Sequence, residues 1–95
     1  MKLVVSPAAA RDFVRLREFL ADKNPAAARQ AIAAVVQAID SLSAYPDRAR
    51  PSGTEGLRDL IVPFGGSAYI VRFGLDSQRQ EVVIVRIWHG REARK

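Results

Sequence analysis

The chain has 95 residues, with 15 Lys and Arg against 10 Asp and Glu, so its formal net charge is +5. This length supports a single domain, 1–95, whose core is small for a stable monomer. The lack of cysteine excludes disulfides, thiol chemistry and cysteine zinc sites, and a single histidine argues against any other metal site. We therefore expect neither a metal nor another cofactor.

The charge is unevenly distributed along the chain. Residues 48–95 carry 9 basic and 5 acidic side chains, so the excess lies in the C-terminal half. It suits an acidic partner, either nucleic acid or an acidic protein segment, although many small domains are equally basic. The N-terminal apolar run is too short for a signal peptide, and no segment approaches the ~18 apolar residues of a membrane helix. We expect a cytoplasmic protein without membrane contact.

The N-terminal half predicts a strand followed by two helices. A short apolar strand, Lys2–Val5, precedes the predicted helices Pro7–Lys23 and Pro25–Ala44. Each helix starts with a capping residue followed directly by proline, Ser6 for the first and Asn24 for the second. Apolar residues recur at helical spacing in both segments. Because the connection is short, the helices should form an antiparallel hairpin.

The C-terminal half predicts an antiparallel meander of three strands, Leu57–Val62, Ser67–Phe73 and Glu81–Trp88. Turns rich in Gly, Pro, Asp and Ser separate these strands. The polar segment 47–55 before them is predicted to be a surface loop. The last strand is almost continuously apolar over 82–87, which is typical of a strand inside a sheet.

The order of these elements predicts an α+β fold, with the helical hairpin packed on a mostly antiparallel four-stranded sheet. The other face of the sheet would be only partly covered and would form a candidate groove. A strand face that mixes Arg and Trp with valines does not suit packing against helices. Strict alternation along the last strand places four residues on that open face: Val82, Ile84, Arg86 and Trp88.

Three local signatures accompany this order of elements: Gly56-Leu57-Arg58-Asp59-Leu60, Tyr69-Ile70-Val71-Arg72-Phe73, and the run from Val82 to Ile87 into His89-Gly90-Arg91. Together they resemble the ParE/RelE family of bacterial type II toxin–antitoxin toxins. The resemblance implies a small basic toxin that a cognate acidic antitoxin, ParD-like, neutralises in a hetero-oligomeric complex. RelE-like members are ribosome-dependent ribonucleases that cut messenger RNA, whereas ParE-like members act on DNA gyrase.

The candidate catalytic residues favour the gyrase branch. RelE-like nucleases commonly carry an Arg directly after the Tyr of the middle strand, where this chain has Ile70. Arg72 shares the face of Ile70, but it is displaced by roughly 6–7 Å, which is a large error for catalysis. His89 is the only side chain of a type that titrates near neutral pH, and the chain ends at Lys95 without a terminal Tyr or second His. We therefore expect a gyrase inhibitor without catalytic residues.

The candidate contact residues gather near the end of the last strand. For target binding we expect His89, Arg91, Trp88 and Arg58. For antitoxin binding we expect Arg86, Trp88, Arg91 and Arg72. If the protein is instead a ribonuclease, its catalytic residues would be His89, Arg91 and Arg72. A third alternative is a non-toxic nucleic-acid-binding module, but the basic residues are spread out rather than gathered into one stripe with aromatics.

Overall fold

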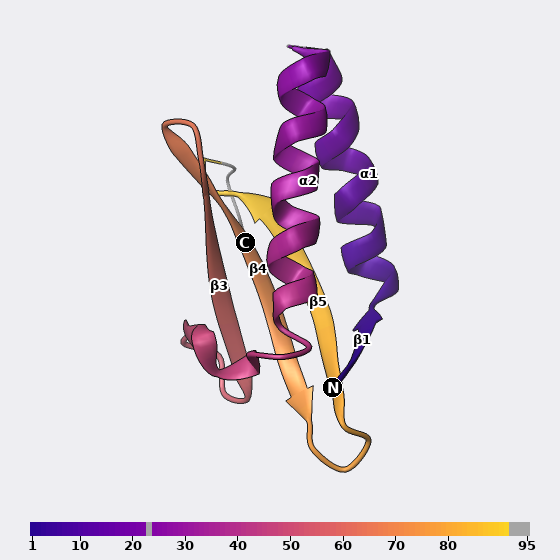
Figure 1. Cartoon of the computed structure of the whole chain (residues 1–95), viewed down its shortest axis with the longest axis vertical. Coiled ribbons are helices and arrows are strands. Elements are labelled where there is room, and N and C mark those ends of the chain that lie inside the picture. Colours follow the sequence, from indigo (N-terminus) through magenta and orange to yellow (C-terminus); the bar gives the residue numbers. More distant parts are fainter. Residues whose placement is uncertain (23, 92–95) are drawn as a thin grey trace.

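The computed structural model describes residues 1–22 and 24–91, and every side chain in them except that of residue 48. Figure 1 shows two layers, with the helical hairpin lying against one face of the sheet. In chain order the elements are β1 (Lys2–Val5), α1 (Pro7–Ala21), α2 (Pro25–Ser41), the 3-10 turn η1 (Pro46–Arg48), β2 (Arg50–Pro51), β3 (Leu57–Phe64), β4 (Ser67–Asp76) and β5 (Glu81–His89). The predicted α+β class is confirmed.

Both helices begin where their capping signals predict. The side chain of Ser6 accepts a hydrogen bond from the Ala9 N–H at 3.1 Å, and that of Asn24 accepts one from the Ala27 N–H at 3.1 Å. Helix α2 ends at Ser41 rather than 44, because the next residues form tighter turns instead of helical hydrogen bonds. Among the described residues, no helix is both long and apolar enough to cross a membrane.

The sheet has five strands, in the order β1-β5-β4-β3-β2, rather than the predicted four. β1 runs parallel to β5 and the other pairs are antiparallel. The additional strand is β2, where Arg50 and Pro51 pair with Asp59 and Arg58 inside the segment predicted as a loop. Two residues are too short to produce a recognisable strand pattern. β5 lies between β1 and β4, so its predicted interior position is confirmed.

The predicted alternation along β5 is wrong, because the strand contains a β-bulge. Phe73 of β4 pairs with Ile84, whereas the preceding Arg72 pairs with Arg86, so Val85 is an extra residue. The bulge shifts the alternation by one position. The residues of β5 that join the core under the helices are Val82, Ile84 and Ile87. Arg86 and Trp88 pair with Arg72 and Ile70 on the opposite side, which we call the open face.

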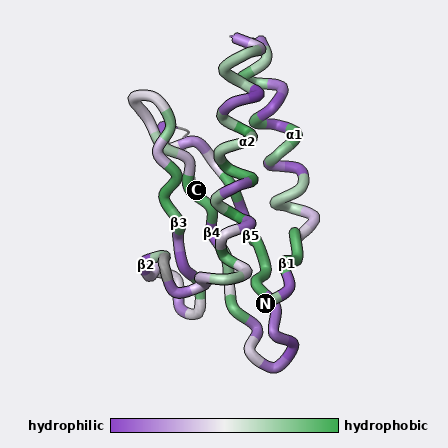
Figure 2. Tube along the Cα trace, in the orientation of Figure 1, coloured by the Kyte–Doolittle hydropathy of each residue, from purple (hydrophilic) through white to green (hydrophobic). Residues whose placement is uncertain are grey.

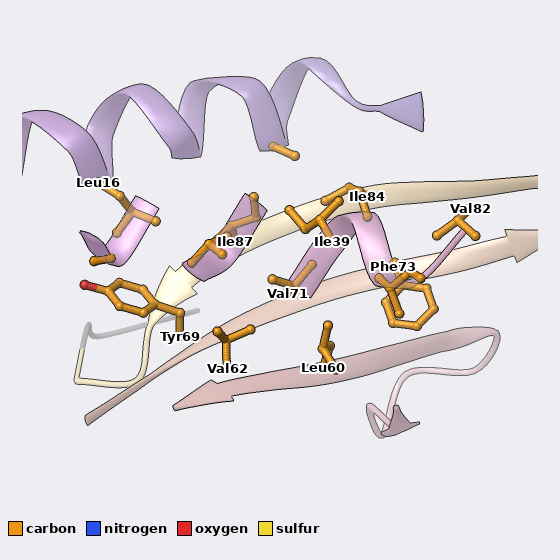
Figure 3. Close-up of a cluster of buried hydrophobic side chains, with 14 residues drawn as sticks. Leu16, Ile39, Leu60, Val62, Tyr69, Val71, Phe73, Val82, Ile84 and Ile87 are labelled. Atoms are coloured by element: carbon orange, nitrogen blue, oxygen red, sulfur yellow. The ribbon is translucent and has the colours of Figure 1, made fainter. Parts of the chain in front are cut away.

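The core fills the space between the helices and the sheet (Figure 3). Leu16 of α1 is 1% exposed and Ile39 of α2 is 5% exposed, while Phe73, Ile84 and Ile87 of the sheet are fully buried. Figure 2 shows the matching pattern in the chain, with hydrophobic segments along the central strands and alternating character along both helices. The apolar faces of the helices therefore bury the apolar face of the sheet.

Candidate functional site at the end of β5

Strands β4 and β5 bring most of the predicted contact residues together. Arg72 pairs with Arg86, and two positions earlier in β4 Ile70 pairs with Trp88, which directly precedes His89. Arg58 lies elsewhere, because it pairs with Phe73 on the helix-covered side and its Nη1 donates to the Ala49 carbonyl at 3.4 Å.

Arg72 is already engaged within the sheet. Its Nε and Nη2 donate to the two carboxylate oxygens of Asp59 at 2.9 and 3.1 Å, and the two side chains are only 13% and 11% exposed. The hydrogen bond to Asp59 raises the pKa of Arg72, against an opposing effect of burial. The bidentate pair fixes the guanidinium in one orientation, so Arg72 is a poor candidate for reaching a phosphate.

Trp88 supports the Arg72 guanidinium. The guanidinium carbon lies 5.0 Å from the centre of the Trp88 ring, within the range of a cation–π contact. Trp88 is only 8% exposed. Any partner on the open face would therefore meet the rim of this ring rather than a free aromatic surface.

Arg86 is held by Asp12, a buried carboxylate of α1. Asp12 is 3% exposed and accepts hydrogen bonds from Arg86 Nε at 2.8 Å, Arg86 Nη2 at 3.2 Å and Arg15 Nη2 at 3.1 Å. Its fourth donor is the backbone N–H of Ile87 at 2.7 Å. Burial raises the pKa of Asp12, but the hydrogen bonds from Arg86, Ile87 and Arg15 outweigh it and hold the pKa below its ordinary value.

Asp12 is a site residue that was not predicted, although the sequence contains a signal for it. Asp12 lies three residues after Ala9 and four before Leu16, and both of these are buried on the inner face of α1. A charged residue inside the apolar stripe of a helix implies a buried partner.

Side chains of α1 and of its N-cap residue Ser6 contact the edge of β5 where no strand pairs with it. β1 pairs with β5 only as far as Ile84. Beyond that point Ser6 Oγ donates to the Val85 carbonyl at 3.1 Å, and Arg15 donates to the Ile87 carbonyl at 3.2 Å. Together with Asp12 on the Ile87 N–H, these contacts satisfy the backbone groups of the strand edge. This section of the edge is therefore occupied, and it does not offer a template for strand addition.

His89 lies at the end of β5 with contacts on both ring nitrogens. Its Nε2 is 2.9 Å from Ser67 Oγ, and its Nδ1 is 3.1 Å from the backbone nitrogen of Arg91. Tyr69 packs edge-on against the ring, with centroids 5.1 Å apart. Because a backbone N–H can only donate, Nδ1 accepts, and the neutral ring carries its proton on Nε2 toward Ser67.

Two adjoining hollows form a groove along the outside of the helical hairpin. The larger, of about 510 Å³, is lined by apolar residues of α2 and flanked by Arg17 and Arg29. The smaller continues toward β1, where it is lined by Leu3, Val5 and Phe13. Val36 borders both hollows and is 42% exposed. We call this surface the hairpin groove.

The chain is short and basic, with a helical hairpin on one sheet face and an Arg–Trp cluster on the other, as expected for the small toxins that its sequence resembles. The family model for the ParE toxin of the type II toxin–antitoxin system parDE matches residues 3–94. The chain belongs to this family, and the expected ParE/RelE membership is confirmed.

Relatives and solved structures agree with this assignment. The chain is 40% identical to Toxin RelE1 of Caulobacter vibrioides, over 97% of this chain and 96% of the relative. It is 32% identical to Toxin RelE3 of the same organism, over 95% of each. Its fold matches the chromosomal ParDE toxin–antitoxin system from P. aeruginosa, with a TM-score of 0.79, 24% identity and coverage of 94% and 95%. It also matches the toxin–antitoxin complex RelBE2 from Mycobacterium tuberculosis, with a TM-score of 0.64, 25% identity and coverage of 93% and 95%.

Proposed function

We propose that this toxin inhibits DNA gyrase by binding it, without cutting messenger RNA. The proposal rests on the two side chains that a nuclease would need most, because both are already bound to other groups of the protein. The ring nitrogens of His89 contact Ser67 and the Arg91 amide, and the guanidinium of Arg72 is bound to Asp59. A positioned general acid or base typically contributes about 10² to 10⁴-fold to a rate, so a nuclease without one would be slow. Gyrase inhibition requires only a binding surface.

The surface proposed for the target is the end of β5 and the turn after it. Arg91 is exposed there, beside the half-buried His89 and the rim of Trp88. An exposed arginine on a fixed turn suits a carboxylate or phosphate of the target. Arg58 contributes less, because it lies on the helix-covered side and contacts Ala49.

The second candidate is a RelE-like ribosome-dependent ribonuclease. The names of the two Caulobacter relatives, at 40% and 32% identity, favour it. In this reading His89 would have to release Ser67 or Arg91 before taking or giving a proton, with Arg91 contacting the phosphate.

The decisive experiment compares purified protein in two assays. We expect inhibition of gyrase supercoiling or trapping of cleaved DNA, with Arg91→Glu reducing the effect at least ~10-fold. Arg79→Glu is the matched control, because Arg79 is 76% exposed in the loop at the other end of β5. Ribosome-dependent cuts in a defined message, lost in His89→Ala, would instead establish the ribonuclease.

We also propose that an acidic antitoxin neutralises the protein and places a helix in the hairpin groove. Two solved structures that share this fold are a ParDE toxin–antitoxin system and a RelBE2 toxin–antitoxin complex. The groove offers an apolar floor with Arg17 and Arg29 beside it, which fits an amphipathic helix with acidic residues along its flank. An extended piece of the same antitoxin would continue over Arg86 and the open face.

Two exposed valines provide a matched test of the groove. Val36 borders the groove, whereas Val14, 44% exposed, lies outside it on α1. Val36→Glu should weaken binding of the proposed acidic antitoxin by ~10-fold or more, because it places a charge against the apolar face of the docked helix. Val14→Glu should bind nearly as the wild type does. Equal affinities for both variants would contradict the proposed groove.

A further inference from the structure

The turn that follows β5 is held in place from two sides. The Gly90 N–H donates to the Ala68 carbonyl at 2.8 Å, and the Arg91 N–H donates to His89 Nδ1 at 3.1 Å. From this geometry we infer that His89 is a positioning residue, which orients the backbone at Arg91 and thereby the Arg91 side chain. The link to target binding rests on the proposed function, whereas the positioning itself does not.

The contact between His89 and Arg91 has the form of a local turn. A side-chain acceptor on one residue receives the backbone N–H two residues later, which is the pattern that Asn and Asp use in Asx-turns. Ser67 holds the other side of the imidazole at 2.9 Å, and the edge contact with Tyr69 limits rotation of the ring. The imidazole therefore connects the start of β4 to the turn that carries Arg91.

Gly90 suits the close approach of this turn to β4. A Cβ atom at this position would lie 3.2 Å from the Ala68 carbonyl oxygen and 3.5 Å from Ile70 Cδ1. The first distance is closer than most Cβ atoms approach a backbone oxygen, so a residue with a Cβ would require the turn or β4 to shift by a few tenths of an ångström. Glycine lets the chain approach closely enough for the Arg91 N–H to reach the imidazole.

The link depends on the protonation state of the imidazole. When both ring nitrogens carry protons, Nδ1 becomes a donor that opposes the Arg91 N–H. Among the described residues, β4 presents the hydroxyl of Ser67 and the ring of Tyr69 to the imidazole, and the segment after β5 presents the backbone N–H of Arg91. Behind Tyr69 is the uncharged ring of Phe64 from β3, at 6.5 Å. Protonation should therefore release the turn.

Two variants at His89 separate positioning from the other possible roles. His89→Asn keeps an acceptor in place of Nδ1 without a titrating ring, and His89→Ala removes the acceptor. In NMR spectra of the full chain, we expect the wild-type ring as the tautomer protonated on Nε2. We expect the Arg91 amide to exchange ~10-fold faster in His89→Ala, and His89→Asn to retain the wild-type rate.

The pH profile and the target assay complete the test. In the wild type the Arg91 amide should lose protection as the imidazole protonates, whereas in His89→Asn protection should follow only the intrinsic pH dependence of exchange. His89→Ala should lower gyrase inhibition several-fold and His89→Asn should restore it.

A ring protonated on Nδ1, or equal Arg91 exchange in wild type and His89→Ala, would overturn the inference. If the exchange data agree but the wild type does not affect gyrase, the positioning role stands and the gyrase proposal fails. If His89→Ala does not fold, the wild-type tautomer and the His89→Asn profile still decide the matter.

Discussion

The two faces of the sheet contrast in chemistry. The helix-covered face is apolar, with Val71, Phe73 and Ile84 fully buried against the hairpin. The open face carries the Asp59–Arg72 pair packed against Trp88, and no described helix lies over it. The first face stabilises the fold by hydrophobic burial, and the second organises charged groups by hydrogen bonding. Arg72 and Arg86, expected to meet a partner, therefore lie on the side of the sheet that the hairpin does not cover, although Asp12 of α1 also holds Arg86.

The largest expected effect comes from the helix-covered face. Phe73→Ala should lower the free energy of unfolding by about 3–5 kcal/mol, because a fully buried ring is removed and a cavity remains. Ile61, 36% exposed on the open side of β3, is the control, and Ile61→Ala should cost less than about 1 kcal/mol. Urea denaturation measures both. Similar losses would mean that both faces contribute equally to the core.

The next effect is at the edge where the two faces meet. Asp12→Ala should lower the free energy of unfolding by about 2 kcal/mol, mainly because the Ile87 N–H loses its acceptor beside the core. The exposed guanidinium of Arg86 adds little, because water can solvate it. Asp40→Ala, at an exposed position of α2, is the control and should change stability by less than about 0.5 kcal/mol. If Asp12→Ala is as mild as the control, the carboxylate does not support the strand edge.

The open-face pair should have a smaller and separable effect. A double-mutant cycle with Asp59→Ala and Arg72→Ala should give a coupling energy of about 1 kcal/mol, because both side chains are largely shielded and the contact is bidentate. The same cycle on Asp76 and Arg79, whose contact is longer and exposed, should give a coupling near zero. If the stability losses of the two single substitutions simply add, solvent screens the Asp59–Arg72 ion pair as it screens an exposed pair.

The smallest effect is a dependence of stability on acid. The pKa of Asp12 is lowered in the folded state from its ordinary value of 3.8, so the unfolded chain takes up the proton first as the pH falls. The stability that the ionised Asp12 carboxylate contributes is complete above the unfolded pKa of 3.8. It is lost as the pH falls through the lower pKa of the folded state. Asp12→Asn should therefore lose less stability than the wild type between pH 5 and pH 3. Asp40→Asn is the matched control, and it should follow the wild-type curve.

The sequence alone determined both helices, the four longer strands and their order. Ser6-Pro7 and Asn24-Pro25 marked the helix starts, and the apolar run over 82–87 placed β5 inside the sheet. These signals are local, because capping, proline geometry and apolar periodicity act within a few residues along the chain. The same patterns, taken with the resemblance, were sufficient to predict the fold class and the family.

Only the tertiary structure decided the partners of the charged residues. The bulge at Val85 reversed the expected faces of Val82 and Ile84, and β2 formed from two residues that carry no strand pattern. Arg86 and Asp12 are 74 residues apart in sequence, and Arg72 finds Asp59 across a strand pair. A pattern along one strand cannot reveal these contacts, because a bulge and a cross-strand ion pair are set by register against another strand or helix.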